Sequence, residues 1–259
     1  IQSHSRRVFM KYYICVCVFL LLNACNSDFS TNQEDIKYPS DKEKSKSNME
    51  ASSKEEDPNK KIKNTLLNDL INLIEIANEH KEKYEKRMQE EPSDQYGILA
   101  FQELDLSVGK ISEDTPQSKK FRKNTYSPLS AIDVNKLKDL SEIIRNSGQI
   151  QGLFNIFNRF GGIFDDSLNH VYSKKDILGG LEILDLDKLK NSFEKLLSIK
   201  ETFSKMLNQL LLDYKNDKDH IRTETNKLKS HTTALFEQLD KKEDEAYEPK
   251  NQIFSISNL

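Results

Sequence analysis

One cysteine in this chain stands in a spacing that a lipid-modifying pathway can use. The run Leu22-Asn23-Ala24-Cys25 places a leucine three residues before the thiol and a small alanine directly before it. A lipoprotein signal peptidase needs both features to seat the bond that it cleaves, although Asn23 departs from the commonest pattern. We therefore predict lipid attachment at Cys25. The alternative is an ordinary cleaved signal followed by a coincidental cysteine.

The residues before Cys25 have the order of a secretory signal. Arg6, Arg7 and Lys11 form a positive flank, and the eleven residues from Tyr12 to Leu22 carry no charge. Because a bilayer core of about 30 Å needs about 20 residues, this run is too short to span it and fits a signal-peptide h-region. We predict a lipoprotein signal peptide over residues 1–24. Met10 is a plausible start, which would leave residues 1–9 untranslated.

A second candidate site is a dense basic stretch. Its four cations could hold a sulfated polysaccharide or another anionic host surface; they are Lys119, Lys120, Arg122 and Lys123. The alternative is that the stretch is only the solvated face of a short helix, which is the commoner reason for such a charge run. A third candidate is the last predicted helix, Ile221 to Leu239, where Leu228 and Leu235 could receive a protein partner.

The histidine, glycine and serine residues of the sequence do not have the spacing of a known catalytic or metal-binding motif. His80, His170, His220 and His231 are scattered, without the four-residue spacing of a helical metal pair. No glycine loop suits a phosphate, and no serine stands in a nucleophile elbow. We expect no enzymatic activity, no metal and no cofactor.

The net charge and the positions of the cysteines limit the kinds of partner and of covalent link that the mature chain could have. The full chain has a net charge of −3, and removing residues 1–24 with their three cations leaves 36 basic and 42 acidic residues, or −6. This balance gives no support to nucleic-acid binding. Cys15 and Cys17 would leave with the signal peptide, so the mature chain has no free thiol and no disulfide once Cys25 is acylated.

Three regions follow Cys25. Residues 25–59 are rich in Ser, Lys, Glu, Asp and Asn and should form a lipidated, disordered tether, because they cannot bury enough apolar surface to offset their ordering entropy. Residues 60–245 should form a compact helical bundle. Pro249 should end the last helix, which leaves residues 246–259 as a C-terminal tail.

The predicted bundle is all-α, with about seven helices and no β-alternation of useful length. Its most apolar segment is Ile150 to Tyr172, which belongs at the centre of a bundle because it is apolar on most sides. Gly161-Gly162 within it would let a neighbouring helix approach closely. The longest pattern runs from Leu189 to Tyr214, with Lys200 at its one non-apolar position.

The combination resembles the Borrelia paralogous family 54 of outer-surface lipoproteins. The resemblance rests on the Cys25 motif, the polar tether, the segment from Tyr96 to Leu106, the run Ile132 to Lys138 and the pattern from Leu189 to Tyr214. It implies a lipid-anchored protein of the outer membrane and cell surface that binds host factors in complement or immune evasion. The alternatives are a host-tissue adhesin for glycosaminoglycan or matrix, and a structural lipoprotein without a host ligand.

The resemblance also bears on the oligomeric state and on serum partners. One family member dimerises through its C-terminal helix and binds factor H in the cleft so formed. Here the last helix has few apolar positions, and Thr225 and Thr232 lie on its stripe. We therefore expect a monomer, with a dimer through the C-terminal helix left open and a host serum or matrix protein as the partner.

Overall fold

The computed structural model describes residues 57–106, 109–257 and 259. The predicted signal peptide, Cys25 and all but the last three residues of the predicted tether lie outside these residues. The described elements, in chain order, are α2 (Pro58–Gln89), η1 (Gln95–Gly97), α3 (Leu99–Glu103), β1 (Asp105–Leu106), β2 (Gly109–Lys110), α4 (Pro116–Leu129), η2 (Val134–Lys136), α5 (Leu137–Asn146), α6 (Ile150–Tyr172), η3 (Lys175–Gly180), α7 (Ile183–Lys215), η4 (Lys218–His220) and α8 (Thr225–Phe254).

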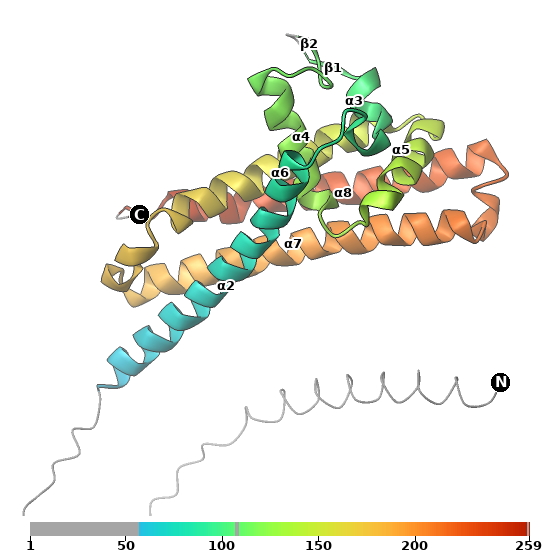
Figure 1. Ribbon diagram of the computed structural model, residues 1–259. Coiled ribbons are helices and arrows are strands. Elements are labelled where there is room, and N and C mark those ends of the chain that lie inside the picture. Colours follow the sequence, from blue (N-terminus) through green and yellow to red (C-terminus); the bar gives the residue numbers. More distant parts are fainter. Residues whose placement is uncertain (1–56, 107–108, 258) are drawn as a thin grey trace, which may run out of the picture. The chain divides into compact units, whose positions relative to one another are not determined.

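The all-α prediction is confirmed. Seven α-helices, α2 to α8, make up most of the described residues, joined by short 3₁₀ turns labelled η (Figure 1). The exception is a short antiparallel pair, β1 with β2, in which Asp105 faces Lys110 and Leu106 faces Gly109. Strands of two residues give no readable alternation, which is why the sequence did not reveal them.

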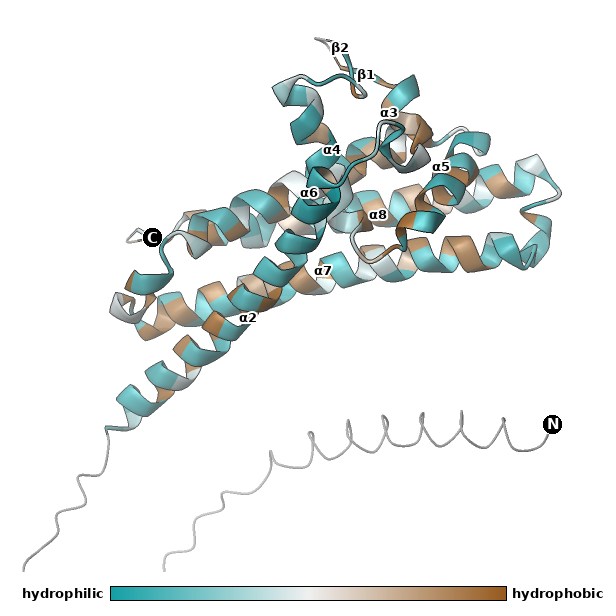
Figure 2. Ribbon diagram, in the orientation of Figure 1, coloured by the Kyte–Doolittle hydropathy of each residue, from teal (hydrophilic) through white to brown (hydrophobic). Residues whose placement is uncertain are grey.

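Helix α6 lies at the centre, as its sequence predicts. It packs against α4, α8 and α2, and its four phenylalanines are at most 1% exposed: Phe154, Phe157, Phe160 and Phe164. The ring of Phe160 stacks on Phe203 of α7 with centroids 4.4 Å apart. Figure 2 shows hydrophobic residues recurring along α7 between hydrophilic ones. These aromatic contacts join α6 and α7 across the core.

The contact between α4 and α6 depends on a missing side chain. A Cβ atom at Gly161 would lie 1.9 Å from the carbonyl oxygen of Asn124, far inside van der Waals contact. At Gly162 the nearest atom would be the Asn124 amide nitrogen, at 3.2 Å. The predicted close approach at the glycine pair is therefore confirmed, and it takes place at Gly161.

Helices α7 and α8 form an antiparallel pair connected through η4. The turn needs left-handed backbone at Asp217 and Asp219, with φ of +49° and +52°. The Asp217 carboxylate accepts hydrogen bonds from the backbone N–H groups of Arg222, at 2.8 Å, and Thr223, at 3.2 Å. These bonds offset the cost of the left-handed residues and hold the start of α8 in place.

The last helix does not end where the C-terminal tail was predicted to begin. Helix α8 continues through Pro249 to Phe254, and Pro249 itself is buried. A proline inside a helix costs about 3 kcal/mol. Burial of Ile253, at 0% exposed, and Ile256, at 4%, opposes that cost. The local proline rule therefore gives way to packing beyond residue 249.

Candidate functional site

The basic stretch lies on α4, whose start is fixed by its cap. Thr115 accepts a hydrogen bond from the backbone N–H of Ser118 at 3.2 Å, and Pro116 occupies the first helical turn. This register exposes Lys119 and Lys120 and turns Arg122 inward, where it is 3% exposed. The stretch is therefore divided between the surface and the interior.

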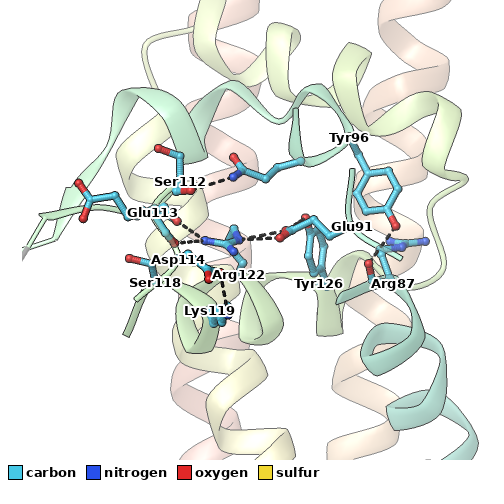
Figure 3. A network of polar contacts seen from close by, with 12 residues as sticks. Arg87, Glu91, Tyr96, Ser112, Glu113, Asp114, Ser118, Lys119, Arg122 and Tyr126 are labelled. Carbon is cyan, nitrogen blue, oxygen red and sulfur yellow. Dashed lines mark hydrogen bonds and ion pairs between the residues drawn. The ribbon is translucent and has the colours of Figure 1, made fainter. Parts of the chain in front are cut away.

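Arg122 is the centre of a buried polar network (Figure 3). Its Nε donates to both oxygens of Glu91, at 3.0 and 3.1 Å, and its Nη1 donates to the backbone carbonyls of Ile111 and Glu113. The Tyr126 hydroxyl donates to the same Glu91 carboxylate. The guanidinium thus joins the residues after α2, the segment before α4 and α4 itself, and its charge is matched by Glu91.

A second arginine extends this connection. The Nη1 and Nη2 atoms of Arg87 donate to the carbonyl oxygens of Leu129 and Ile132 at 2.8 and 2.9 Å. The Tyr96 hydroxyl donates to the Arg87 carbonyl at 2.9 Å, which fixes a tyrosine whose φ is +58°. The two hydrogen bonds of the Arg87 guanidinium therefore hold the end of α2 to the end of α4 and the residues that follow it.

The remaining cations of the stretch are also partnered, with one exception. Lys123 forms an ion pair with Asp165 of α6 at 2.7 Å, and Lys119 pairs with Asp114 at 2.7 Å. Lys120 points to solvent. The structure therefore does not bring the four cations together on one open face, nor is the stretch simply a solvated helix face.

A buried lysine is the polar feature that periodicity alone did not explain. Lys200, the one non-apolar position of the α7 pattern, is 2% exposed. Its Nζ donates to the carbonyl oxygen of Ser127 at 2.7 Å and to the hydroxyl of the same residue at 3.1 Å. It also lies 4.5 Å from the ring centroid of Phe164. Burial lowers the pKa of Lys200 to about 7.

The pairing of Ser127 with Lys200 has the residue types of a nucleophile and a base, but not the access. Ser127 is 0% exposed, so no substrate carbonyl could reach its hydroxyl in this structure. No three His, Cys, Asp or Glu side chains gather as a metal site among residues 57–106, 109–257 and 259. Over that same part of the chain, no helix is long and apolar enough to cross a bilayer.

The apolar stripe of the last helix is used inside the molecule. Leu228 is 4% exposed, Leu235 is 7% exposed and Thr232 is 0% exposed, because this side of α8 faces α6 and α7. The expectation that Leu228 and Leu235 receive a protein partner is therefore wrong for this conformation. A sequence stripe shows that a helix has a buried side, but not whether the covering helix belongs to the same chain.

A groove between α5 and α7 is a site-like feature that the sequence did not reveal. It has a volume of about 610 Å³, and its apolar part is formed by Ile143, Leu211 and Leu212. The charged residues around it are Lys136, Asp139, Glu142, Lys215 and Arg222. Within the described structure, the Lys136 and Lys215 side chains show no ion pair, so both charges are open to a ligand. The lining comes from distant parts of the sequence, which explains why no motif indicated it.

Comparisons with known proteins agree with this fold. Residues 85–258 match the protein family described as Borrelia Bbcrasp-1 domain containing protein. The solved structure of BSE31 from the Lyme disease agent Borrelia (Borreliella) spielmanii is 45% identical, with a TM-score of 0.73; the match covers 75% of this chain and 100% of that chain. No functionally curated protein matches.

More distant solved structures share the fold alone. The Borrelia burgdorferi outer surface lipoprotein BBA64 is 21% identical with a TM-score of 0.56, over 76% of this chain and 97% of that chain. The Lyme disease associated outer surface protein BBA65 from Borrelia burgdorferi is 20% identical with a TM-score of 0.60, over 71% of this chain and 99% of that chain.

Proposed function

Because this chain belongs to the Borrelia Bbcrasp-1 domain family of outer surface lipoproteins, we propose that it is a lipid-anchored surface protein that binds a host serum protein in complement or immune evasion. The family match over residues 85–258 carries the proposal. The 45% identity to BSE31 over the whole of that chain supports the same assignment.

The anchor is proposed at Cys25, with residues 25–56 as the connection to the bundle. Leu22 and Ala24 before the thiol support cleavage there, and the polar composition that follows supports a flexible tether. Cys25→Ala should abolish acyl labelling and partition into detergent. Unchanged labelling would mean that another residue carries the anchor. Loss of the protein from intact cells on protease treatment tests the surface location.

The groove between α5 and α7 is the proposed binding surface. Its volume lies in the range of ligand-binding clefts, and its lining combines apolar side chains with charged ones. Leu212 is 50% exposed there, so an apolar anchor of a partner would gain by covering it. The glycosaminoglycan alternative has less support, because Arg122 and Lys123 are used in internal ion pairs. A monomer is proposed, since the apolar side of α8 is already covered.

Serum capture with matched variants tests this function. Residues 25–259 immobilised on a surface should retain a complement protein from serum at physiological salt, identified by mass spectrometry. Leu212→Glu should reduce capture at least about tenfold, because a charge replaces a desolvated contact. Ile76→Glu is the control, since Ile76 on α2 is 45% exposed and lies outside the groove.

Two outcomes would count against the proposal. If the protein captures no complement protein and gives a serum-sensitive strain no survival advantage, the complement function fails. Adhesion to host tissue would then be tested on heparin and matrix proteins. If both glutamate variants reduce capture equally, binding is real but the groove is not its location.

A further inference from the structure

Exposed apolar side chains gather at one end of the bundle. Among the described residues, nine large hydrophobic side chains are clearly exposed, and five of them belong to the segments that meet where the chain enters α2. Leu184 is the most exposed of all, at 78%. We call these five the η3-end surface: Ile62, Tyr172, Ile177, Leu184 and Phe254.

Contacts between distant segments place these residues at the same end. Ile62 of α2 and Leu184 of α7 line one shared hollow with Leu66 and Ile183. A Cβ atom on Gly179 of η3 would lie 3.7 Å from Leu67 of α2.

The end of α8 meets the same group of segments. The ring of Phe254 stacks on His170 near the end of α6, with centroids 4.3 Å apart. Lys188 near the start of α7 donates to the Ser255 hydroxyl at 3.0 Å. In Figure 1 the start of α7 and the end of α8 lie on the same side, away from the turn between α7 and α8.

The chemistry of this end favours shallow apolar contact. Leucine, isoleucine, tyrosine and phenylalanine are side chains that partition into the interfacial zone of a bilayer. The charges beside them are mixed: Lys61 and Asp187 line the same hollow, and Asp185 and Lys188 flank Asp187 in the sequence. A surface without one dominant sign is suited to neutral lipid headgroups, and binding to it should depend little on salt.

We propose that the η3-end surface docks on the lipid surface of the membrane that holds the Cys25 lipid. This proposal rests on the proposed lipid anchor. Cys25 and Asp57 are 32 residues apart, and α2 begins one residue later, next to the docking residues. A flexible chain of that length has an end-to-end distance of about 30 Å. Such a link gives an effective concentration in the millimolar range, so even weak apolar contacts are occupied.

The docked orientation points the groove between α5 and α7 away from the lipid. Leu184 and Leu212 are 28 residues apart on the same uninterrupted helix α7, which places them about 42 Å apart along its axis. Leu184 belongs to the η3-end surface, and Leu212 belongs to the groove. The two leucines therefore report on the two ends of the molecule.

The chain contains no tryptophan, so a single introduced indole can report on each end. Residues 25–259 contain Cys25 as their one thiol. Coupling that thiol to a maleimide lipid in phosphatidylcholine vesicles supplies the anchor chemically. We expect brominated phosphatidylcholine to quench Leu184→Trp about twofold and to leave Leu212→Trp unquenched, because only an indole at the lipid surface meets bromine. The pair Ile62→Ser and Ile177→Ser, added to Leu184→Trp, should remove the quenching without unfolding an exposed site.

Three results would overturn the docking proposal. They are no quenching at either position, equal quenching at both, and quenching of Leu184→Trp that survives the two serine substitutions. An emission shift of Leu184→Trp that depends on protein density, without quenching by lipid, would assign the surface to a second copy instead. Failure of the proposed lipid anchor can be distinguished from failure of the docking proposal, because it would appear as a missing acyl label on Cys25 in cells.

Discussion

The ammonium of Lys200 on α7 donates to the backbone carbonyl of Ser127 on α4 at 2.7 Å, inside the core. Among the residues that the structure describes, Lys200 Nζ donates to the carbonyl and hydroxyl oxygens of Ser127 and to no carboxylate. Lys83 and Arg87 oppose its charge and Asp165 favours it, but burial is the largest cause of its lowered pKa. A lysine that is desolvated in the folded protein and free in water when unfolded links stability to pH.

Stability should rise with pH above neutrality. The pKa of Lys200 is about 7 in the folded protein, against about 10.4 for an unfolded lysine. Between these values the unfolded chain binds the proton more often, so the free energy of unfolding increases with pH. The gain should be about 2 kcal/mol from pH 7 to pH 9. Urea unfolding at pH 7, 8 and 9 measures it.

A variant that lacks only Lys200 isolates the contribution of this residue to the pH dependence of stability. Lys200→Met should lose most of this slope, because it keeps the side-chain length and removes the titrating group. His80 and His170, whose pKa values are lowered, change the free energy of unfolding mainly below pH 7. Tyr84, whose pKa is raised, changes it mainly above pH 9. An unchanged slope in Lys200→Met would show that another group is responsible.

Gly161→Ala should be costly, and Gly162→Ala should not. The added methyl at Gly161 meets the backbone of α4, which cannot move without separating the helices. We expect a loss of about 3 kcal/mol or more. At Gly162 the neighbouring Asn124 side chain can shift, and helix propensity favours alanine. Urea midpoints of the two variants make the comparison, and equal values would contradict the assigned contact.

Within the basic stretch, replacing a buried cation should reduce stability much more than replacing an exposed one. Arg122→Ala leaves the Glu91 carboxylate, which is 10% exposed, without its charged partner, and we expect a loss of about 3–5 kcal/mol. Lys120→Ala removes an exposed charge and should change stability by less than about 0.5 kcal/mol. Thermal unfolding of both variants tests this division. A common surface role would instead give both variants small losses.

Phe160→Ala should destabilise the bundle by about 3–5 kcal/mol, because its ring is fully buried and stacked on Phe203. Phe254→Ala is the matched aromatic control, since Phe254 is 47% exposed. Its loss should be much smaller. Similar losses, measured by urea unfolding, would mean that α6 is not the central helix in solution.

Apolar periodicity was sufficient to predict much of the fold. The pattern from Ile150 to Tyr172 predicted α6 with its bounds, and the stripe from Leu189 to Tyr214 predicted the buried side of α7. These predictions held because a helix buries whichever side is apolar. Pro249 misled the prediction of the last helix, since burial of Ile253 beyond it depends on residues far away in the sequence.

The polar features were less predictable because they depend on pairings across the fold. Nothing local to Arg122 indicates that Glu91, 31 residues earlier, will receive its charge. Lys200 was visible as an interruption of the stripe, but its acceptor on Ser127 was not. The groove likewise needs α5 and α7 to be placed side by side. Its residues become a set only in three dimensions.

The continuous length of α7 has a mechanical consequence. A helix of 33 residues without an internal break is about 50 Å long and resists bending. In a molecule docked as proposed, a ligand in the groove is therefore held at a fixed height above the lipid. Changes in the tether would alter how often the domain lifts off, but not this spacing. The bundle then acts as a rigid spacer, and a host protein is met clear of the headgroups.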